Sequence, residues 1–237
     1  MTQGALPRHV AVIMDGNGRW AMRHKLQVAM GHRKGVEALR AVIRLSSDLG
    51  VEALSLYAFS TENWRRDPKE VGALMGLLLE YFTKEIDELH EKNVCIRILG
   101  DVDGLPEAQR NAVRAAEART RGNTGLKLSI ALNYGGRAEL ARAARLLAAR
   151  AARGEIRPED IDESMLADAL YTHGLPDVDL LIRTSGEMRL SNFLLYQCAY
   201  AEFEFPAVLW PDFDEKAYRE ALEAFAARDR RFGGRKG

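Results

Sequence analysis

The chain has 237 residues, which suits one large domain or two small ones. Its 34 Lys and Arg side chains balance 34 Asp and Glu side chains, so the formal net charge is zero. Such neutrality is atypical of proteins that hold nucleic acid by bulk charge, and we expect no nucleic-acid partner.

The chain also lacks the patterns of secreted and membrane proteins. Its two cysteines, Cys95 and Cys198, have no metal-ligand or disulfide spacing, and no apolar run approaches about 18 residues. No charged N-terminal segment precedes an apolar stretch, so we expect no signal peptide. These features predict a cytoplasmic protein with reduced thiols.

Apolar runs of strand length alternate with longer helical patterns along the chain. The predicted strands are residues 10–14, 53–59, 94–99, 126–132, 178–182 and 201–205. The predicted helices are residues 32–49, 70–91, 105–121, 136–153, 163–172 and 213–229. Strands alternating with helices imply a mainly parallel sheet covered on both faces. We therefore predict a single α/β domain with a central, mostly parallel sheet flanked by helices.

The first predicted strand ends at the sequence Asp15-Gly16-Asn17-Gly18-Arg19. Glycine lets backbone N–H groups approach an anion closely, and a following helical turn adds its positive end. Arg19 can bind a phosphate through two N–H groups, and Asp15 beside a phosphate suits Mg²⁺. Asp-Gly alone is more often a tight turn than a binding site, and the surrounding sequence is what favours a site here. It matches neither the Rossmann pattern, which needs a third glycine, nor a Walker loop, which needs GK[ST].

Phosphate-binding residue types also follow other predicted strands. The segment STENWRR at 60–66 follows the second strand, and RTSGEMRLSN at 183–192 follows the fifth. His32 lies near a helix start, where it could donate to a pyrophosphate oxygen or be an ordinary core histidine. Carboxyl ends of parallel strands meet along one sheet edge, where ligands bind. Converging loops of this kind predict a site for two phosphate groups.

Several segments of the chain occur together in an order typical of one enzyme family. They are MDGNGRWA, GH, YAFSTENW, NYGGR, RTSGEMRLSNFLL with AYAE, and VLWPDF with RRFGG. Together they resemble the cis-prenyltransferases, typified by undecaprenyl diphosphate synthase. The resemblance covers residues 6–234. We therefore expect residues 1–237 to form a single catalytic domain with a core of about 6–234 and short flexible termini.

The resemblance implies successive head-to-tail condensation of isopentenyl diphosphate onto an allylic diphosphate such as farnesyl diphosphate. Each new double bond is Z, and the product is a long-chain polyprenyl diphosphate, the undecaprenyl-type carrier lipid precursor for cell-wall glycan synthesis. The resemblance also implies a Mg²⁺ cofactor and a homodimer, in which the tail at 231–233 reaches the partner's active site. A peripheral membrane contact for product release is expected as well.

The resemblance assigns roles to individual residues. Asp15 would bind Mg²⁺ and assist departure of the allylic pyrophosphate, Asn63 would sit where the proton leaves isopentenyl diphosphate, and Glu202 would support the metal. The expected substrate-binding residues are Gly16, Asn17, Gly18, Arg19, Trp20, His32, Ser60, Thr61, Glu62, Trp64, Arg66, Arg183, Arg189, Leu190 and Ser191. Those from Gly16 to Arg19, with His32, would hold the allylic pyrophosphate. Arg183, Arg189 and Ser191 would hold that of isopentenyl diphosphate.

The chain departs from the family pattern at a few positions. Val28 stands where the family usually has an arginine that contacts the allylic pyrophosphate; Arg23, Lys25 or Arg33 is a candidate to compensate. Met188 stands where some members have a metal-coupled histidine, so we expect no metal role there.

The growing apolar chain needs a tunnel, which we expect between strand 53–59 and helix 70–91. Small Ala58 would leave this tunnel open, and Leu126 would lie near its floor. The sequence does not fix the product length, so a short-chain cis-prenyl diphosphate synthase is an alternative.

Two other classes of protein compete with this interpretation. A HAD-like phosphohydrolase uses an aspartate after the first strand, but normally has a second acid two residues on, where this chain has Asn17. A non-catalytic accessory subunit would be expected to have lost the loop from Asp15 to Arg19, which is intact here.

Overall fold

The computed structural model describes residues 6–229. Within this range, no helix is long and apolar enough to cross a membrane. The expected flexible termini and the tail at 231–233 lie outside the described residues.

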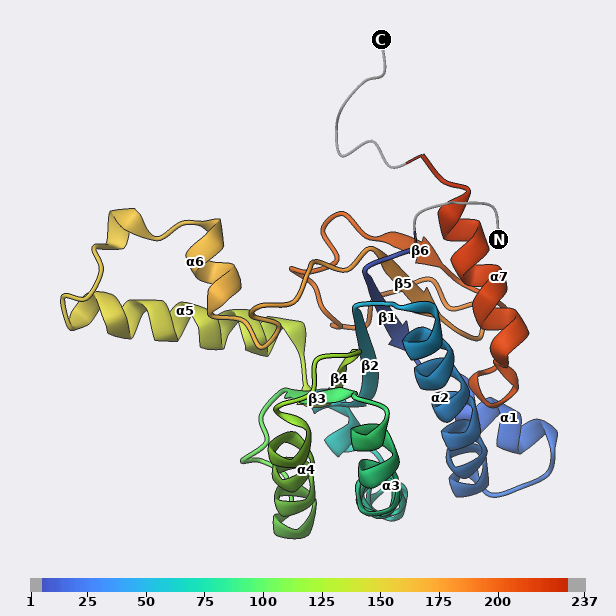
Figure 1. Cartoon of the computed structure of the whole chain (residues 1–237). Coiled ribbons are helices and arrows are strands. Elements are labelled where there is room, and N and C mark those ends of the chain that lie inside the picture. The colour runs from blue at the N-terminus through green and yellow to red at the C-terminus, as the bar shows by residue number, and fades with distance from the viewer. Residues whose placement is uncertain (1–5, 230–237) are drawn as a thin grey trace.

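A six-stranded sheet forms the centre of the molecule (Figure 1). Its strands are β1 His9–Ile13, β2 Ala53–Ser60, β3 Cys95–Leu99, β4 Lys127–Tyr134, β5 Leu180–Arg183 and β6 Glu202–Glu204. Their order is β3-β4-β2-β1-β5-β6, and every neighbouring pair is parallel. The α/β class is confirmed, and the sheet is entirely parallel rather than mostly so.

The helices follow the predicted pattern, with one helix missed and several ends shifted. They are α1 Asn17–Arg23, α2 Val28–Leu49, α3 Pro68–Glu91, α4 Glu107–Thr120, α5 Gly136–Ala152, α6 Glu163–Asp168 and α7 Glu215–Ala226. Short 3₁₀ turns occur at Thr61–Arg65, Pro158–Asp160 and Trp210–Asp212. The sequence prediction missed α1 as a separate helix, began α2 four residues too late, and made α6 four and α7 five residues too long.

β1 is buried on both faces, which explains its unbroken run of apolar residues. Val10 and Val12 belong to the larger core, which joins the sheet to α2, α3, α4 and α7. Ala11 and Ile13 point to the opposite face, where Phe193 and residues after it form a second core. That second cover is irregular chain rather than helix, so helices do not flank the sheet evenly.

Helices α5 and α6 form an arm that projects from the sheet (Figure 1). The arm is anchored by the buried carboxylate of Glu139 in the first turn of α5. This carboxylate accepts hydrogen bonds from the hydroxyl of Tyr134, the side chain of Gln197 and the backbone N–H of Tyr171. Three hydrogen bonds compensate the burial of this polar side chain and hold the base of the arm in place.

Candidate active site

The strand order places a ligand crevice beside the end of β1. After β1 the chain builds β2, β3 and β4 on one side, and then returns to place β5 and β6 on the other. In open parallel sheets, ligands bind at the carboxyl ends of the strands where the winding direction changes. Asp15 follows β1 at that point, so the fold alone gives this carboxylate a prominent position.

Close contacts hold the backbone at Asp15 and leave space only for a glycine at position 16. Gly16 has a φ of 109°, and an added Cβ would lie 2.9 Å from Cδ2 of Leu209. The backbone N–H of Asp15 donates to Oγ1 of Thr184 at 3.0 Å, and this hydroxyl donates to the Asp15 carbonyl at 2.6 Å. The end of β1 is thus joined to the end of β5.

The carboxylate of Asp15 contacts two arginines from different parts of the chain. Its Oδ1 accepts a hydrogen bond from Arg19 at 3.1 Å, and its Oδ2 accepts one from Arg183 at 2.8 Å. Burial alone would raise the pKa of Asp15, but Arg183 and then Arg19 outweigh it and hold this pKa below its ordinary value. Asp15 is therefore ionised at neutral pH.

Arg183 is a cation held in place by its surroundings. Only 5% of its side chain is exposed. Nη1 donates to the backbone oxygen of Arg189 at 2.5 Å and to Oγ of Ser191 at 2.7 Å, while Nη2 pairs with Asp15. The predicted residues Arg183, Arg189 and Ser191 are thus brought together beside Asp15.

Glu187 is a carboxylate that the sequence analysis missed. It accepts a hydrogen bond from Arg19 at 3.0 Å and another from Arg189. Arg189, ahead of Arg19, lowers the pKa of Glu187. Glu187 therefore pairs with two arginines that were expected to bind phosphate. In the sequence, its position between Arg183 and Arg189 was the only sign of such a role.

The turn after β2 forms the opposite side of the crevice. Oδ1 of Asn63 accepts a hydrogen bond from the backbone N–H of Ser60 at 2.9 Å, and the Ser60 side chain accepts one from the backbone of Asn63. This capping box fixes the Asn63 amide at the mouth of the crevice. Nearby, Nε2 of His32 lies 3.9 Å from Glu70, which also accepts a 2.8 Å hydrogen bond from Arg66.

Asn192 joins three of these loops and was not singled out from the sequence. Its side chain accepts a hydrogen bond from the backbone N–H of Arg137 and donates one to Glu62, both at 2.9 Å. Its own carbonyl accepts from the backbone N–H of Gly136 at 2.7 Å. Its φ of 66° is in the left-handed region, which asparagine tolerates better than most residues. This φ could not be anticipated from the sequence.

A cavity of about 720 Å³ extends from Asp15 between the sheet, α2 and α3. This volume lies in the usual range of small-molecule sites, about 300–1,000 Å³. Predicted site residues lining it are Asp15, Asn17, His32, Ser60, Glu62, Asn63, Arg66, Arg183, Arg189 and Ser191. Apolar residues lining it include Leu56, Ala58, Leu74, Leu77, Leu78, Tyr81, Phe82, Ile130 and Leu132. One hollow thus combines a charged mouth with a long apolar wall.

Some predicted residues do not line the cavity. Trp20 donates its indole N–H to Asp212 at 2.8 Å, and Trp64 donates to Asn133 at 2.8 Å. The others outside the lining are Gly16, Gly18, Arg19, Thr61, Leu190 and Glu202. Leu126, expected near the tunnel floor, is buried in the core, and β4 contributes Ile130 and Leu132 to the lining instead.

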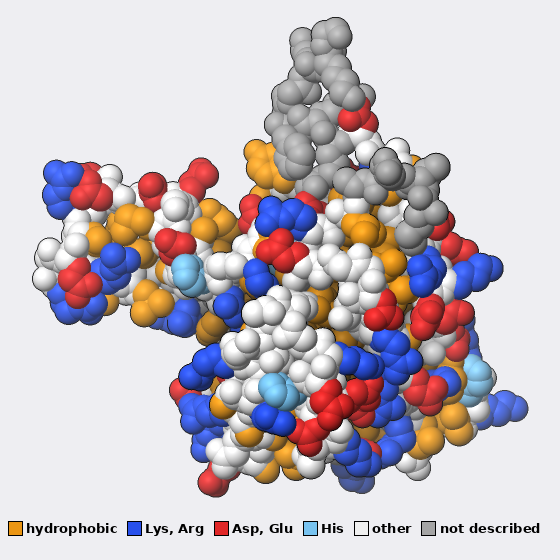
Figure 2. All heavy atoms as spheres, in the orientation of Figure 1, with side chains coloured by type: hydrophobic (Ala, Val, Ile, Leu, Met, Phe, Trp, Pro, Cys, Tyr) orange, Lys and Arg blue, Asp and Glu red, His pale blue; other side chains and the backbone are white. Residues whose placement is uncertain are grey.

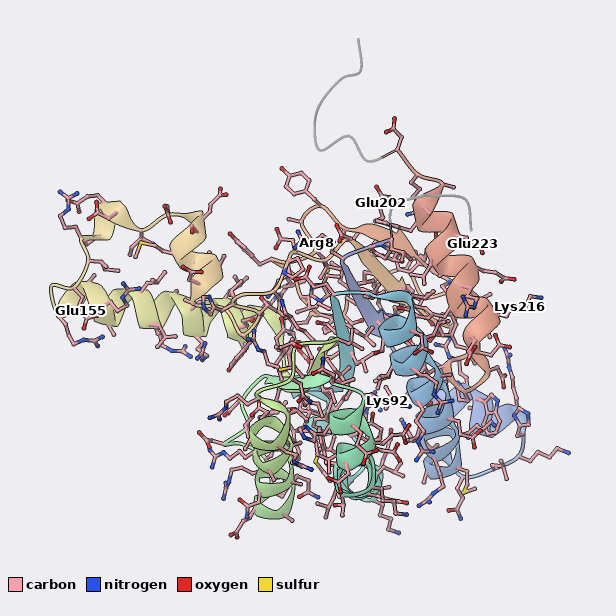
Figure 3. The ribbon with its side chains drawn as sticks, viewed as in Figure 1. Arg8, Lys92, Glu155, Glu202, Lys216 and Glu223 are labelled. Carbon is pink, nitrogen blue, oxygen red and sulfur yellow. The ribbon has the colours of Figure 1, made fainter. Side chains whose placement is uncertain are left out.

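Glu202 lies at the wrong end of the sheet to share a metal with Asp15. In the strand register Glu202 pairs with Leu180, which pairs with Val10. Val10 lies five residues before Asp15, or roughly 16 Å along a strand. Figure 3 shows Glu202 on the same side of the sheet as Arg8, which precedes β1, and Glu202 forms an ion pair with Arg228 at 2.9 Å. Within one chain, Glu202 therefore lies too far from Asp15 to bind the same metal ion.

The donor set at Asp15 suits a cation that needs few protein ligands. Within residues 6–229, no three side chains of His, Cys, Asp or Glu gather around a metal-sized position. Mg²⁺ commonly takes one or two protein carboxylates together with waters and substrate phosphates. A single ionised carboxylate at a cationic mouth fits this pattern, whereas it does not fit zinc.

Val28, the departure from the expected arginine, begins α2 beside the first loop. Its Cγ1 lies 3.9 Å from the position that a Cβ on Gly18 would take. Of the cations considered as substitutes, Arg33 pairs with Glu80 at 3.3 Å, and Arg23 and Lys25 are exposed.

Comparisons with known proteins agree with this arrangement. The Prenyltransf family model, described as "Putative undecaprenyl diphosphate synthase", matches residues 13–233. An isoprenyl transferase of Clostridium perfringens is 49% identical over 234 residues, covering 99% of this chain and 92% of the relative. The ditrans,polycis-undecaprenyl-diphosphate synthase ((2E,6E)-farnesyl-diphosphate specific) of Escherichia coli K12 is 50% identical over 227 residues, 96% of this chain and 90% of its own.

Solved structures give the same result. Lavandulyl diphosphate synthase from Lavandula x intermedia, in complex with dimethylallyl diphosphate, has a TM-score of 0.94 at 38% identity, covering 96% of this chain and 98% of its own. A probable undecaprenyl diphosphate synthase from Campylobacter jejuni has a TM-score of 0.79 at 32% identity, covering 97% and 99%. The chain belongs to the undecaprenyl diphosphate synthase family of prenyltransferases.

Proposed function

We propose that this prenyltransferase adds isopentenyl diphosphate units in succession to an allylic diphosphate such as farnesyl diphosphate. Each step makes a Z double bond, and the product is a long-chain polyprenyl diphosphate of the undecaprenyl carrier type. The observation that carries the proposal is the single cavity of about 720 Å³ that joins Asp15, Arg183 and Arg189 to an apolar wall. A substrate with a charged head and a long apolar tail matches this combination.

The first loop and its neighbours would bind the allylic substrate. The backbone from Gly16 to Gly18, with Arg19 and His32, would hold the allylic pyrophosphate. Ionisation of an allylic diphosphate separates charge, so preorganised donors on the leaving pyrophosphate lower the barrier. Mg²⁺ held by Asp15 would supply additional positive charge at this leaving group. Because Glu202 lies too far away in the same chain, we propose Asp15 as the metal ligand that this chain supplies to its own cavity.

The second phosphate site would be the group around Arg183. Arg183, Arg189 and Ser191 lie together, and all three line the cavity. They would hold isopentenyl diphosphate so that its double bond faces the allylic carbon. Asn63, fixed by its capping box across the crevice, would orient the carbon that loses a proton. An amide is not a base, so Asn63 positions this carbon and the departing pyrophosphate can accept the proton.

The apolar wall explains why the chain could grow without release. Each CH₂ group moved out of water contributes about 0.8 kcal/mol, so a five-carbon unit contributes up to roughly 4 kcal/mol. Apolar residues from β2, β4, α2 and α3 surround this path. Ala58 and Tyr81 illustrate the range of side-chain size along it, which would influence where growth ends.

We also propose a homodimer. Tyr200 is 68% exposed, and Phe203 on the edge strand β6 is 37% exposed. An edge strand with exposed aromatic side chains is a surface that a second copy could cover. Light scattering of the purified chain measures the mass directly, and a monomer at micromolar concentration would contradict the dimer.

An assay with radiolabelled isopentenyl diphosphate, farnesyl diphosphate and Mg²⁺ tests the function, with extraction of the lipid product. We expect a labelled lipid from the wild type, and loss of it after chelation of Mg²⁺ or in Asp15→Ala. Asp87→Ala is the control, because Asp87 is 77% exposed on α3 and does not line the cavity. Absence of lipid product from the wild type would sink the proposal.

The same assay separates the alternatives. A HAD-like phosphohydrolase would release phosphate without forming lipid, and an accessory subunit would do neither alone. A short-chain synthase would stop after one or a few additions, which chromatography of the dephosphorylated products reveals. The extended apolar lining favours the long-chain product.

A further inference from the structure

The turn between α1 and α2 exposes large apolar side chains. We name residues 22–30 the α1–α2 tip; in it Met22 is 75% exposed, Leu26 45%, Val28 41% and Met30 46%. Figure 2 shows hydrophobic side chains at the lower right, over this turn, next to basic side chains. Residues 22–28 are exposed without interruption. Scattered exposed apolar residues are ordinary, but four in nine residues are a concentration typical of an interaction site.

The charge of the α1–α2 tip has one sign. No Asp or Glu occurs in the sequence between Asp15 and Glu37. In the part of the chain that the structure describes, Arg33 pairs with Glu80 and Lys34 with Glu37, whereas no carboxylate lies within ion-pair distance of Arg23 or Lys25. The tip therefore presents unneutralised positive charge beside its apolar side chains, which complements an anionic surface.

The α1–α2 tip also borders a second hollow, of about 390 Å³, between α2 and α3. Val28 and Gln27 line this hollow at the tip. His32, Leu74 and Leu77 line both this hollow and the main cavity, and Asp67, Lys69 and Glu70 add charged side chains to the second hollow. The apolar surface of the tip thus borders a hollow that shares lining side chains with the cavity that would hold the growing chain.

We propose that the α1–α2 tip docks on the surface of an anionic lipid bilayer. Apolar side chains that enter the headgroup region and basic side chains that attract anionic lipids are the two contributions that peripheral binding combines. Docking in this way places the second hollow at the bilayer, where a finished polyprenyl chain would leave between α2 and α3. This last consequence rests on the proposed function, whereas the docking itself does not.

Co-sedimentation of the full chain with lipid vesicles tests the docking. We expect binding to vesicles of phosphatidylcholine mixed with phosphatidylglycerol, weak binding to phosphatidylcholine alone, and loss of binding at high salt. The variant Met22→Ser, Leu26→Ser, Met30→Ser should lower the partition coefficient about tenfold or more, as should Arg23→Glu with Lys25→Glu.

Matched controls separate the tip from general surface properties. Leu146→Ser with Ile161→Ser changes apolar side chains that are 43% and 37% exposed on the arm, and Arg121→Glu with Lys216→Glu changes exposed cations elsewhere. Both should bind vesicles like the wild type. Equal binding by the tip variants, equal binding to phosphatidylcholine alone, or no binding by the wild type overturns the proposal. In the last case a protein partner would account for the patch.

An activity assay keeps this test separate from the proposed function. In detergent without vesicles, the Met22, Leu26 and Met30 variant should condense isopentenyl diphosphate at the wild-type rate. A fall in that rate would mean that the substitutions disturb the cavity, and the inference from this variant would fail. If the wild type made no lipid product, the proposed function would fail while the vesicle result still decided the docking.

Discussion

Asp15 and Arg183 form an ion pair of 2.8 Å although 168 residues separate them in the chain. The pair exists because β1 and β5 are neighbours, with Ile13 opposite Arg183 in the register. Its cation is almost fully buried and its carboxylate is partly exposed at the cavity mouth. The guanidinium of Arg183 is therefore held in the interior, whereas the carboxylate of Asp15 faces the cavity mouth.

The stability of the protein should depend on Asp15 ionisation at acid pH. Because the folded-state pKa of Asp15 is lowered, its contribution is fully present above the ordinary value of 3.8 and is lost as the pH falls below it. We expect Asp15→Asn to unfold at lower urea than the wild type at pH 6, with the gap narrowing below about pH 4. Urea midpoints from pH 3 to pH 6 measure this. A gap independent of pH would contradict it.

Replacing Arg183 by lysine should damage the site while keeping the charge. Arg183 reaches Asp15, Ser191 and the backbone of Arg189 from two nitrogens, which a single ammonium group does not reproduce. We expect kcat/KM for isopentenyl diphosphate to fall by about tenfold or more in Arg183→Lys. Steady-state kinetics measure this change. Arg40 is the control: it forms an ion pair with Glu85 at 2.5 Å and does not line the cavity. Arg40→Lys should therefore retain normal kinetics.

Glu187 should compete with substrate phosphate for Arg19 and Arg189. Removing its charge in Glu187→Gln frees both arginines, so we expect the KM for isopentenyl diphosphate to fall by about two- to fivefold. Glu155→Gln is a matched control, since Glu155 also forms ion pairs with two arginines, Arg150 and Arg153, but lies on the arm. A higher KM in Glu187→Gln would show that the carboxylate orients the arginines rather than competing.

An arginine at position 28 should strengthen binding of the allylic substrate. Val28 lies beside Gly18 in the first loop, and Val28→Arg adds a cation there. We expect the KM for farnesyl diphosphate to fall about three- to tenfold. Met30→Arg places the same charge two residues further along α2 and should have little effect. An unchanged KM in Val28→Arg would mean that no contact is missing in this chain.

A larger side chain at position 58 should shorten the product. Ala58 lines the cavity from β2, so Ala58→Leu fills part of the space available to the growing chain. We expect the main product to lose at least one five-carbon unit, at a stability cost of about 1–3 kcal/mol. Chromatography of the dephosphorylated products measures the length. Ala138→Leu on the exposed side of α5 should leave it unchanged.

Sequence patterns located the sheet well because buried parallel strands are continuous apolar runs. β1 to β5 and the position of Asp15 at a strand end follow from such runs, and so does the convergence of Asp15 and Arg183 at one edge. The contact between particular side chains did not follow. Nothing in the segment Arg183 to Arg189 indicates that Glu187 folds back onto Arg19, because this depends on the turn geometry.

Glu202 shows a second limit. The alternation of residues around it predicts a strand, and the structure contains one. An isolated strand pattern does not give the register against its neighbour, and the register decides which sheet edge a residue approaches. The second cover of the sheet was missed for a related reason, because Phe193 and Leu194 lie in irregular chain that has no periodicity to detect.

The central position of β1 has a consequence for synthesis on the ribosome. β1 is made first, but one of its two neighbours, β5, is made fifth. A nascent chain that has released only β1 to β4 therefore carries Asp15 without its buried cation and has an unpaired strand edge. Such an edge is a ready site for mispairing, and distant strand partners slow folding. The crevice at Asp15 thus closes only near the end of translation, and until then one edge of β1 is open to mispairing.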